Sequence, residues 1–229
     1  MLSLRAMSAD TSTNPLLVRN ALPKFDAISP QHVGPAVASV LAAAEQRVAQ
    51  LRQQQQIDFD WALQLEDVRQ SISQVFSPIA HMSRVVSSPG MRDAYNDCLP
   101  KITDFMTRLG QDPELLRGYK ELARQPAVAE DSTRAELVRH ALRDLRLAGI
   151  GLPTAEQTEF REIMQTLAKK EAAFEQNLMD ATDAFSWQCE RVEELEGLPA
   201  SLIATAADNA GEQGTAGYHL KLDPPTSWR

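Results

Sequence analysis

The sequence predicts an all-α protein, made mainly of six or seven antiparallel helices with one short strand near the C-terminus. Its 229 residues include only 10 Gly and 6% aromatic residues, while Ala, Leu, Gln, Glu and Arg are abundant. This composition favours helices over sheets. Apolar residues also recur at helical spacing in several long segments, and helix-start signals such as Ser-Pro and Asp-Pro precede them.

The N-terminal region is expected to be irregular. Residues 1–13 are polar and unpatterned, which predicts a disordered tail. The segment from Asn14 to Ile28 contains two prolines among scattered apolar residues. It is interpreted as an extended arm held at four apolar positions, which are Leu16, Leu17, Leu22 and Phe25.

The first two helices have clear start signals. Ser29 is expected to cap the first, with Pro30 at the first helical position, where its missing N–H is not needed. The apolar stripe of this helix is Val33, Val37, Val40, Leu41, Ala44, Val48 and Leu51. Asp60 is expected to cap the second helix, whose apolar face runs from Trp61 to Ile79. Pro78 should kink or break it.

The next two helices begin with proline signals. Ser88-Pro89 opens a helix that ends at Gly110, in which Pro100 allows a bend or an earlier break. Asp112-Pro113 opens a short helix that runs through Leu122.

Two capping boxes precede the later helices. Thr133 and Glu136 form the first, ahead of a helix whose buried face is Leu137, Ala141, Leu145 and Ala148. Thr154 and Gln157 form the second, ahead of the longest helix. Seven of its residues are expected to point inward: Phe160, Ile163, Leu167, Phe174, Leu178, Ala181 and Phe185. A short helix from Leu198 to Ala207, a polar loop from Asp208 to Ala216 and a strand from Tyr218 to Leu222 complete the chain.

Charge and cysteine content exclude several classes of function. The formal charge of −8 argues against a nucleic-acid-binding protein, which would need a basic surface. The two cysteines, Cys98 and Cys189, lie far apart, as is typical of a reducing compartment. Neither a secretory signal peptide nor a membrane-spanning segment is apparent. We therefore expect a soluble cytoplasmic protein that binds no membrane.

No catalytic or metal site is evident from the residues. The four histidines are isolated, and the chain contains no HExxH, GxSxG or GxxxxGK[ST] motif. Cys98 lies on an apolar helix face, which favours an inert core thiol over a nucleophile. Arg139, Arg143 and Arg146 share one helix face and could meet phosphate or peptide carboxylates, although such stripes are usually solvated.

A series of short motifs resembles one enzyme family. They are NPLL at 14–17, LPKF at 22–25, FSPIAH at 76–81, ALRDLRLAGIGLP at 141–153, FEQNLMDAT at 174–182, LEGLP at 195–199 and GYHLKLD at 217–223. In the same order, these motifs resemble the N-terminal region of oligopeptidase A-like enzymes, within the thimet oligopeptidase and neurolysin family of zinc metallopeptidases. The resemblance covers residues 14–226, and residues 227–229 fall outside it.

The resemblance implies a helical N-terminal domain that forms one wall of a channel in which short peptides are cut. It also implies that the zinc ligands and general base lie further along the family's chain, so no catalytic or metal residue is assigned here. Arg139 and Arg143, with the loop from Asp208 to Ala216, are candidates to face the channel. The family would continue beyond Thr226, so the end at Arg229 is expected to truncate the enzyme before its catalytic domain.

Two functions remain open. Such a domain is expected to be inactive alone, with zinc and short peptides belonging to the full-length enzyme. Alternatively, it is a stand-alone helical interaction module that binds a catalytic half, a homologous partner or a second copy through an exposed apolar face.

Overall fold

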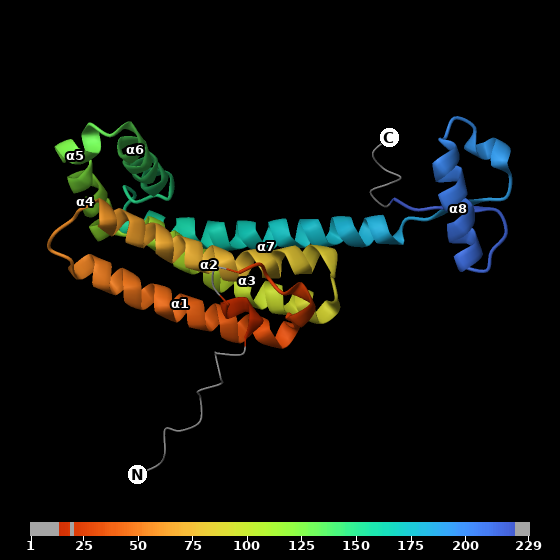
Figure 1. Ribbon diagram of the computed structural model, residues 1–229, viewed down its shortest axis with the longest axis horizontal. Helices are drawn as coiled ribbons and strands as arrows, with labels where there is room; N and C mark the ends of the chain where they lie inside the picture. The colour runs from red at the N-terminus through yellow and green to blue at the C-terminus, as the bar shows by residue number, and fades with distance from the viewer. Residues whose placement is uncertain (1–13, 19–20, 223–229) are drawn as a thin grey trace, which may run out of the picture. The chain divides into compact units, whose positions relative to one another are not determined.

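The computed structural model describes residues 14–18 and 21–222, which form two compact units divided between Lys170 and Glu171. In these residues the all-α prediction is confirmed, with eight α-helices and one two-stranded sheet (Figure 1). None of the described helices is long and apolar enough to cross a membrane. The expected tail at 1–13 lies outside the described residues.

The first unit is built on a bundle of three long helices, α1 (Pro30–Gln53), α2 (Phe59–Val85) and α3 (Pro89–Gly110), which pack against one another (Figure 1). The predicted stripes supply its core, which includes Val37, Leu65 and Phe105. The predicted break at Pro78 does not occur, and α3 likewise continues through Pro100. Buried apolar faces on both helices outweigh the one backbone hydrogen bond that each proline removes.

Smaller helices pack together beside this bundle: α4 (Pro113–Leu122), α5 (Pro126–Ala129) and α6 (Ser132–Leu147). The sequence prediction did not include α5. A buried carboxylate links α4 to α1, because Arg52 Nε donates to Asp112 Oδ2 over 2.6 Å. Asp112 Oδ1 also accepts from the backbone amides of Glu114 and Leu115, so it is the N-cap of α4.

A close approach joins α4 to α2. Gly118 of α4 lies against the indole of Trp61, and a Cβ at residue 118 would lie 2.6 Å from Trp61 Cη2. The indole cannot easily move aside, because its Nε1 donates to Leu51 O over 3.1 Å and its ring contacts Tyr119 edge-on. Glycine is therefore required here by packing, although its backbone conformation is helical.

Three of the predicted helix caps are wrong. Asp58 rather than Asp60 caps α2, since its Oδ1 accepts from the amide of Trp61 at 3.1 Å. Asp131 rather than Thr133 caps α6, because the helix already begins at Ser132 and Asp131 Oδ1 accepts from the amides of Thr133 and Arg134. The Ser29 cap is confirmed, and its amide donates to His32 Nδ1.

The third incorrect cap concerns α7 (Thr154–Ala184), which already includes Thr154. Gln157 does not complete a capping box but donates from Nε2 to the carbonyls of Gly149 and Ile150 in the preceding turn. Gly149 adopts φ +85° in this turn, a conformation that favours glycine. Gln165 Nε2 also donates to Asp104 Oδ1 of α3 at 3.5 Å, so the first half of α7 lies along the bundle.

The second unit contains the last part of α7, a two-stranded antiparallel sheet and one further α-helix. Strands β1 (Trp187–Cys189) and β2 (Tyr218–Leu220) pair antiparallel, with Gln188 opposite His219. The strand near Tyr218 was predicted, and β1 was not. Helix α8 (Ala200–Glu212) packs on β2 and extends through much of the predicted loop from Asp208, so that loop is shorter than expected.

The predicted inward face of α7 is wrong. Ile163 is 55% exposed, Phe174 68% and Leu178 56%. The buried or half-buried side of the helix instead carries Met164, Ala168 and Ala172. Periodicity identifies an apolar face but not what covers it, and here the smaller residues lie on the covered side.

Candidate functional site

A hollow in the first unit lies beside a polar edge of α2. Gln70, Ser73, Gln74, Ser77 and His81 recur at helical spacing and are all exposed. The Ser73 and Ser77 hydroxyls lie 3.3 Å apart. The opposite side of α2 is buried in the bundle, so this edge is fixed in position.

The N-terminal arm forms the facing wall. Its short 3-10 turns, η2 (Pro15–Leu17) and η3 (Phe25–Ala27), replace the extended conformation that the prolines predicted. The arm is anchored because Asn14 Nδ2 donates to His32 O over 2.9 Å and Leu16 is buried. The Phe25 ring lies against the His81 ring, with centroids 5.4 Å apart.

Two of the four predicted anchoring positions are therefore confirmed as contacts, namely Leu16 and Phe25. The prediction for Leu22 is wrong, because its side chain is 90% exposed and does not anchor the arm. Leu17 is half-buried.

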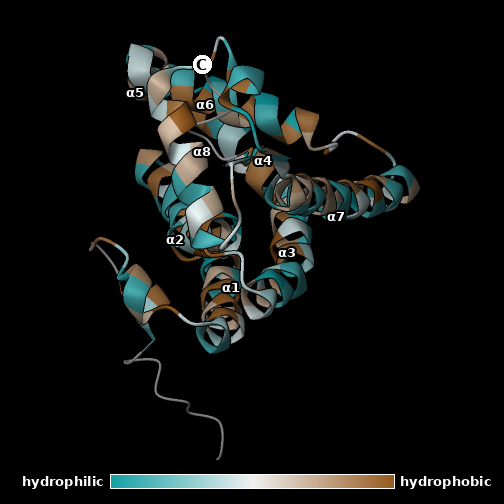
Figure 2. Ribbon diagram, turned by 90° about the vertical axis from the view of Figure 1, so that its right-hand side faces the viewer, coloured by the Kyte–Doolittle hydropathy of each residue, from teal (hydrophilic) through white to brown (hydrophobic). Residues whose placement is uncertain are grey.

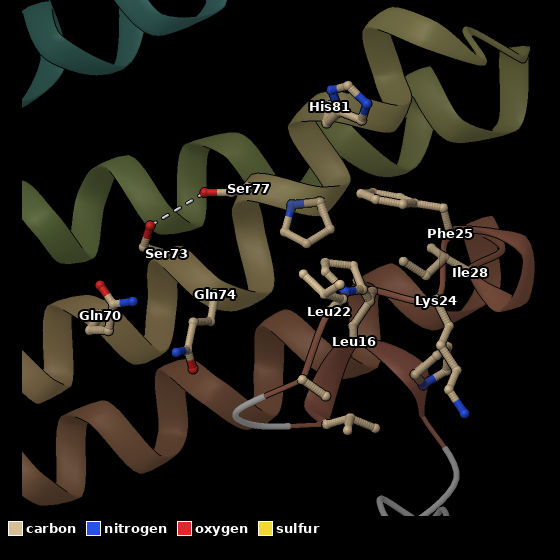
Figure 3. Close-up of a pocket in the computed structure, with 15 residues that line it drawn as sticks. Leu16, Leu22, Lys24, Phe25, Ile28, Gln70, Ser73, Gln74, Ser77 and His81 are labelled. Atoms are coloured by element: carbon tan, nitrogen blue, oxygen red, sulfur yellow. Dashed lines mark hydrogen bonds between the residues drawn. The ribbon is translucent and has the colours of Figure 1, made fainter.

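Between the arm and α2 lies a groove of about 660 Å³, shown in Figure 3. The arm supplies apolar surface from Leu16, Leu22, Phe25 and Ile28, whereas α2 supplies amides and hydroxyls. This volume lies in the range of small-molecule pockets or of a few residues of peptide.

The groove is suited to binding rather than catalysis. Among the described residues that line it, the titratable side chains are Lys24 and His81, and neither a carboxylate nor a thiol is present. Histidine is the commonest general acid or base, but the His81 ring packs against Phe25, and no described lining residue supplies a carboxylate to orient it. The apolar arm with the Gln70 and Gln74 amides instead suits an apolar segment whose backbone hydrogen-bonds to side chains.

The two candidate channel-facing arginines lie elsewhere, on the exposed face of α6. Arg139 forms a two-pronged ion pair with Glu136, one prong being Nε to Oε2 at 2.8 Å. Arg143 donates to Asp144 Oδ1 from Nε at 2.9 Å and Nη2 at 2.7 Å. Neither residue lines the groove.

These pairs change the electrostatics of the α6 face. The hydrogen bond from Arg139 lowers the pKa of Glu136 to about 2, and His140 contributes further through its Nε2 contact at 2.8 Å. The same bond raises the pKa of Arg139. Each arginine therefore presents a charge that a neighbouring carboxylate partly neutralises, and an anionic ligand would have to compete with that carboxylate.

The histidines and cysteines lie in separate structural positions. His32 is part of the α1 cap, His81 contacts Phe25, His140 contacts Glu136 and His219 lies in β2. Cys98 is buried in the bundle, and burial raises the pKa of its thiol, as expected for a core residue. Within the described residues, no group of three His, Cys, Asp or Glu side chains could hold a metal ion.

Sequence reasoning missed the groove itself. The spacing of Gln70, Gln74 and His81 shows a polar edge on α2, but such edges normally face water. Leu22 in the Pro-containing arm gave little signal by itself, because single exposed apolar residues are common on protein surfaces.

Comparison with known proteins shows the family to which the chain belongs. Residues 37–157, more than half of it, match the family model for the N-terminal domain of neurolysin and thimet oligopeptidase. The chain is 34% identical over 218 residues to oligopeptidase A of Escherichia coli, and 31% identical over 216 residues to that of Haemophilus influenzae. Each alignment covers 93% of this chain and 32% of the relative.

A plant protein described as a probable cytosolic oligopeptidase A, from Arabidopsis thaliana, is 30% identical over 231 residues, which cover 96% of this chain and 33% of that relative. The chain thus spans about a third of the length of the curated relatives it matches. It belongs to the neurolysin and thimet oligopeptidase family, and its sequence corresponds to that family's N-terminal domain.

Proposed function

We propose that this chain acts as the N-terminal part of an oligopeptidase A-like zinc metalloendopeptidase that degrades short peptides, and that it forms one wall of the peptide channel. The observation that carries this proposal is the extent of the match. Some 93% of the chain aligns with oligopeptidase A of Escherichia coli, but only 32% of that enzyme is covered. A segment of that kind contributes structure and substrate contacts to an enzyme whose chemistry lies in the remainder.

The chain alone is proposed to be inactive. A catalytic zinc needs three protein ligands that converge on one point, commonly with two histidines one helical turn apart. The residues present do not fit such a site, because the four histidines lie in separate elements and each described contact is with a different group. The metal would be held by the part of the enzyme that this chain does not cover, in a cytoplasmic setting.

Arg139 and Arg143 are proposed to face the channel and to meet the carboxylates of a bound peptide. Guanidinium groups bind carboxylates in two-pronged geometry, and Arg139 already makes such a contact with Glu136. A peptide carboxylate would take the place of the one supplied by α6.

A chimaera tests the proposal directly. The corresponding region of Escherichia coli oligopeptidase A is replaced by residues 14–222 of this chain, and hydrolysis of a fluorogenic peptide is measured. We expect activity within about tenfold of the parent enzyme, because substrate positioning would survive the replacement. The same enzyme without any N-terminal region is the control.

Two results would contradict the proposal. A folded, zinc-loaded chimaera no more active than the deletion control would refute the structural role. Zinc-dependent cleavage by the 229-residue chain itself would refute its inactivity. In an active chimaera, Arg139→Ala and Arg143→Ala should raise KM with little change in kcat, whereas Arg117→Ala on α4 serves as the matched surface control.

A second candidate function is supported by α7. Its exposed apolar face, with Phe174 68% and Leu178 56% exposed, is typical of a surface that binds another protein. On this reading the chain is an interaction module for a catalytic half or a homologous partner. Calorimetric titration with the remaining two thirds of the Escherichia coli enzyme tests it, and absence of heat at micromolar concentrations would count against it.

A further inference from the structure

The groove between the arm and α2 has uncovered apolar surface on its arm side. Three of its lining side chains are exposed, namely Val18 at 57%, Leu22 at 90% and Phe25 at 43%. They line one hollow together, whereas exposed apolar residues on most surfaces are scattered singly. Figure 2 shows apolar residues in this part of the chain as well as in the helices. A ligand with apolar groups would shield this surface from water, which favours binding.

The polar edge of α2 has the repeat of an extended peptide. Gln70 and Gln74 are four residues apart, which is about 6 Å along the helix axis. Ser73 and Ser77 repeat the same spacing. Along an extended chain, backbone groups that point to the same side recur every second residue, about 6.6 Å apart. Because a glutamine amide both donates and accepts, the two glutamines can bond to alternate peptide groups of one extended segment.

One end of the groove carries the basic side chains. Lys24 precedes Phe25 in the arm, and the Phe25 ring lies against His81 of α2, so Lys24 and His81 belong to the same end (Figure 3). Gln70 lies at the other end, three turns earlier on α2. None of the described lining residues is acidic. The carboxyl terminus of a free peptide is complementary in charge to the Lys24 end, and this orients the peptide along the groove.

We propose that this groove binds the last residues of an apolar peptide in extended conformation, with the free carboxylate of the peptide at the end that carries Lys24 and His81. Between Gln70 and His81 the edge of α2 is about 16 Å long, which accommodates about five extended residues. The binding is a property of this chain by itself. It does not rest on the proposed peptidase role, which the chimaera tests separately.

A peptide titration followed by NMR is the first test. The probe is the pentapeptide Leu-Ala-Leu-Ala-Leu with a free carboxylate, added to the 15N-labelled 229-residue chain. We expect saturable amide shifts in the arm and along the polar edge of α2, with a dissociation constant of about 100 µM. Absence of saturable shifts up to about 1 mM peptide overturns the proposal, and so do shifts confined to other elements.

A cycle between peptide and protein tests where the carboxylate lies. The same peptide with an amidated carboxyl terminus should bind about tenfold more weakly, because it has lost its negative charge. Lys24→Gln should weaken the free peptide several-fold but leave the amidated peptide unchanged. Lys101→Gln, an exposed lysine of α3 outside the groove, is the matched control and should change neither affinity. If Lys24→Gln weakens both peptides equally, the proposed orientation is overturned.

The glutamines provide an independent test of the extended conformation. Gln70→Ala with Gln74→Ala removes both amides from the α2 edge and should weaken the pentapeptide by about tenfold. Both residues are exposed, so the double variant should keep the wild-type helix content by circular dichroism. Gln55→Ala, at an exposed glutamine outside the groove, is the control. An unchanged affinity in the double variant overturns the assignment of these amides to the peptide backbone.

Discussion

Gly118 gives the sharpest test of the packing between α4 and α2. In an exposed helix interior, Gly→Ala usually stabilises by about 1 kcal/mol, because alanine loses less backbone entropy. At residue 118, however, the added Cβ would lie 2.6 Å from Trp61 Cη2 and 2.8 Å from Cζ2. Overpacking of this kind typically costs about 1–3 kcal/mol. We therefore expect Gly118→Ala to destabilise the chain by about 1–2 kcal/mol.

The magnitude depends on whether the indole can move. Its Nε1–H donates to Leu51 O, and the Trp61 side chain is 1% exposed, so displacement would break a buried hydrogen bond. Trp61→Phe removes the ring atoms that the new Cβ would meet. Although Trp61→Phe is itself destabilising, the further cost of Gly118→Ala in that background should fall to near zero.

Urea unfolding followed by circular dichroism at 222 nm measures these differences. Gly211→Ala in α8 is the matched control, because no atom lies within 4 Å of its added Cβ. It should be neutral or stabilising. If Gly118→Ala stabilises the chain as much as Gly211→Ala does, the close approach of α4 to Trp61 is refuted.

Three further outcomes follow from other contacts. Asp112→Ala should lower the free energy of unfolding in urea by about 2–3 kcal/mol, because it removes both the α4 cap and the Arg52 ion pair. Asp112→Asn keeps the cap and should cost about 1 kcal/mol less than Asp112→Ala. Equal costs for the two variants would contradict this division. The Glu136 carboxyl should titrate near pH 2 by NMR and return toward its usual pKa in Arg139→Gln. Because the pKa of Glu136 is lowered in the folded chain, any stability that Glu136 contributes is present above its unfolded pKa and is lost as the pH falls toward 2. An unchanged titration midpoint in Arg139→Gln would exclude Arg139 as the cause of the lowered pKa. The chain should enhance the fluorescence of a hydrophobic dye, because Phe174 is 68% exposed. Phe174→Ser should reduce this enhancement at concentrations where the wild type is monomeric. An unchanged signal would show that the dye binds elsewhere.

The helices that carry large buried side chains could be predicted from the sequence. In α1 to α4, apolar periodicity coincides with a start signal such as Ser29-Pro30 or Asp112-Pro113, and both pieces of information are local. The cap errors at Asp60 and Thr133 are each displacements of two residues, since several polar side chains compete for the same free amides.

What could not be predicted depends on contacts that are not local. The burial of α7 was assigned to its large residues, but the covered side carries Met164, Ala168 and Ala172. Strand β1 was missed because three residues carry little pattern by themselves, and its pairing with β2 joins segments about thirty residues apart. The groove beside α2 likewise depends on where the arm folds back, which no local spacing specifies.

The two walls of that groove differ in how firmly they are held. Helix α2 belongs to the bundle, and its amides are bonded over many turns. The arm is held by a few short-range bonds, such as those from the amides of Leu17, Ala27 and Ile28. It should therefore open by local unfolding far more often than the bundle does, and its amides should exchange with solvent first. A ligand of the groove would bind only when the arm is closed, so the free energy of closing the arm would be subtracted from its binding free energy. Ligand binding would then slow hydrogen exchange at the arm amides.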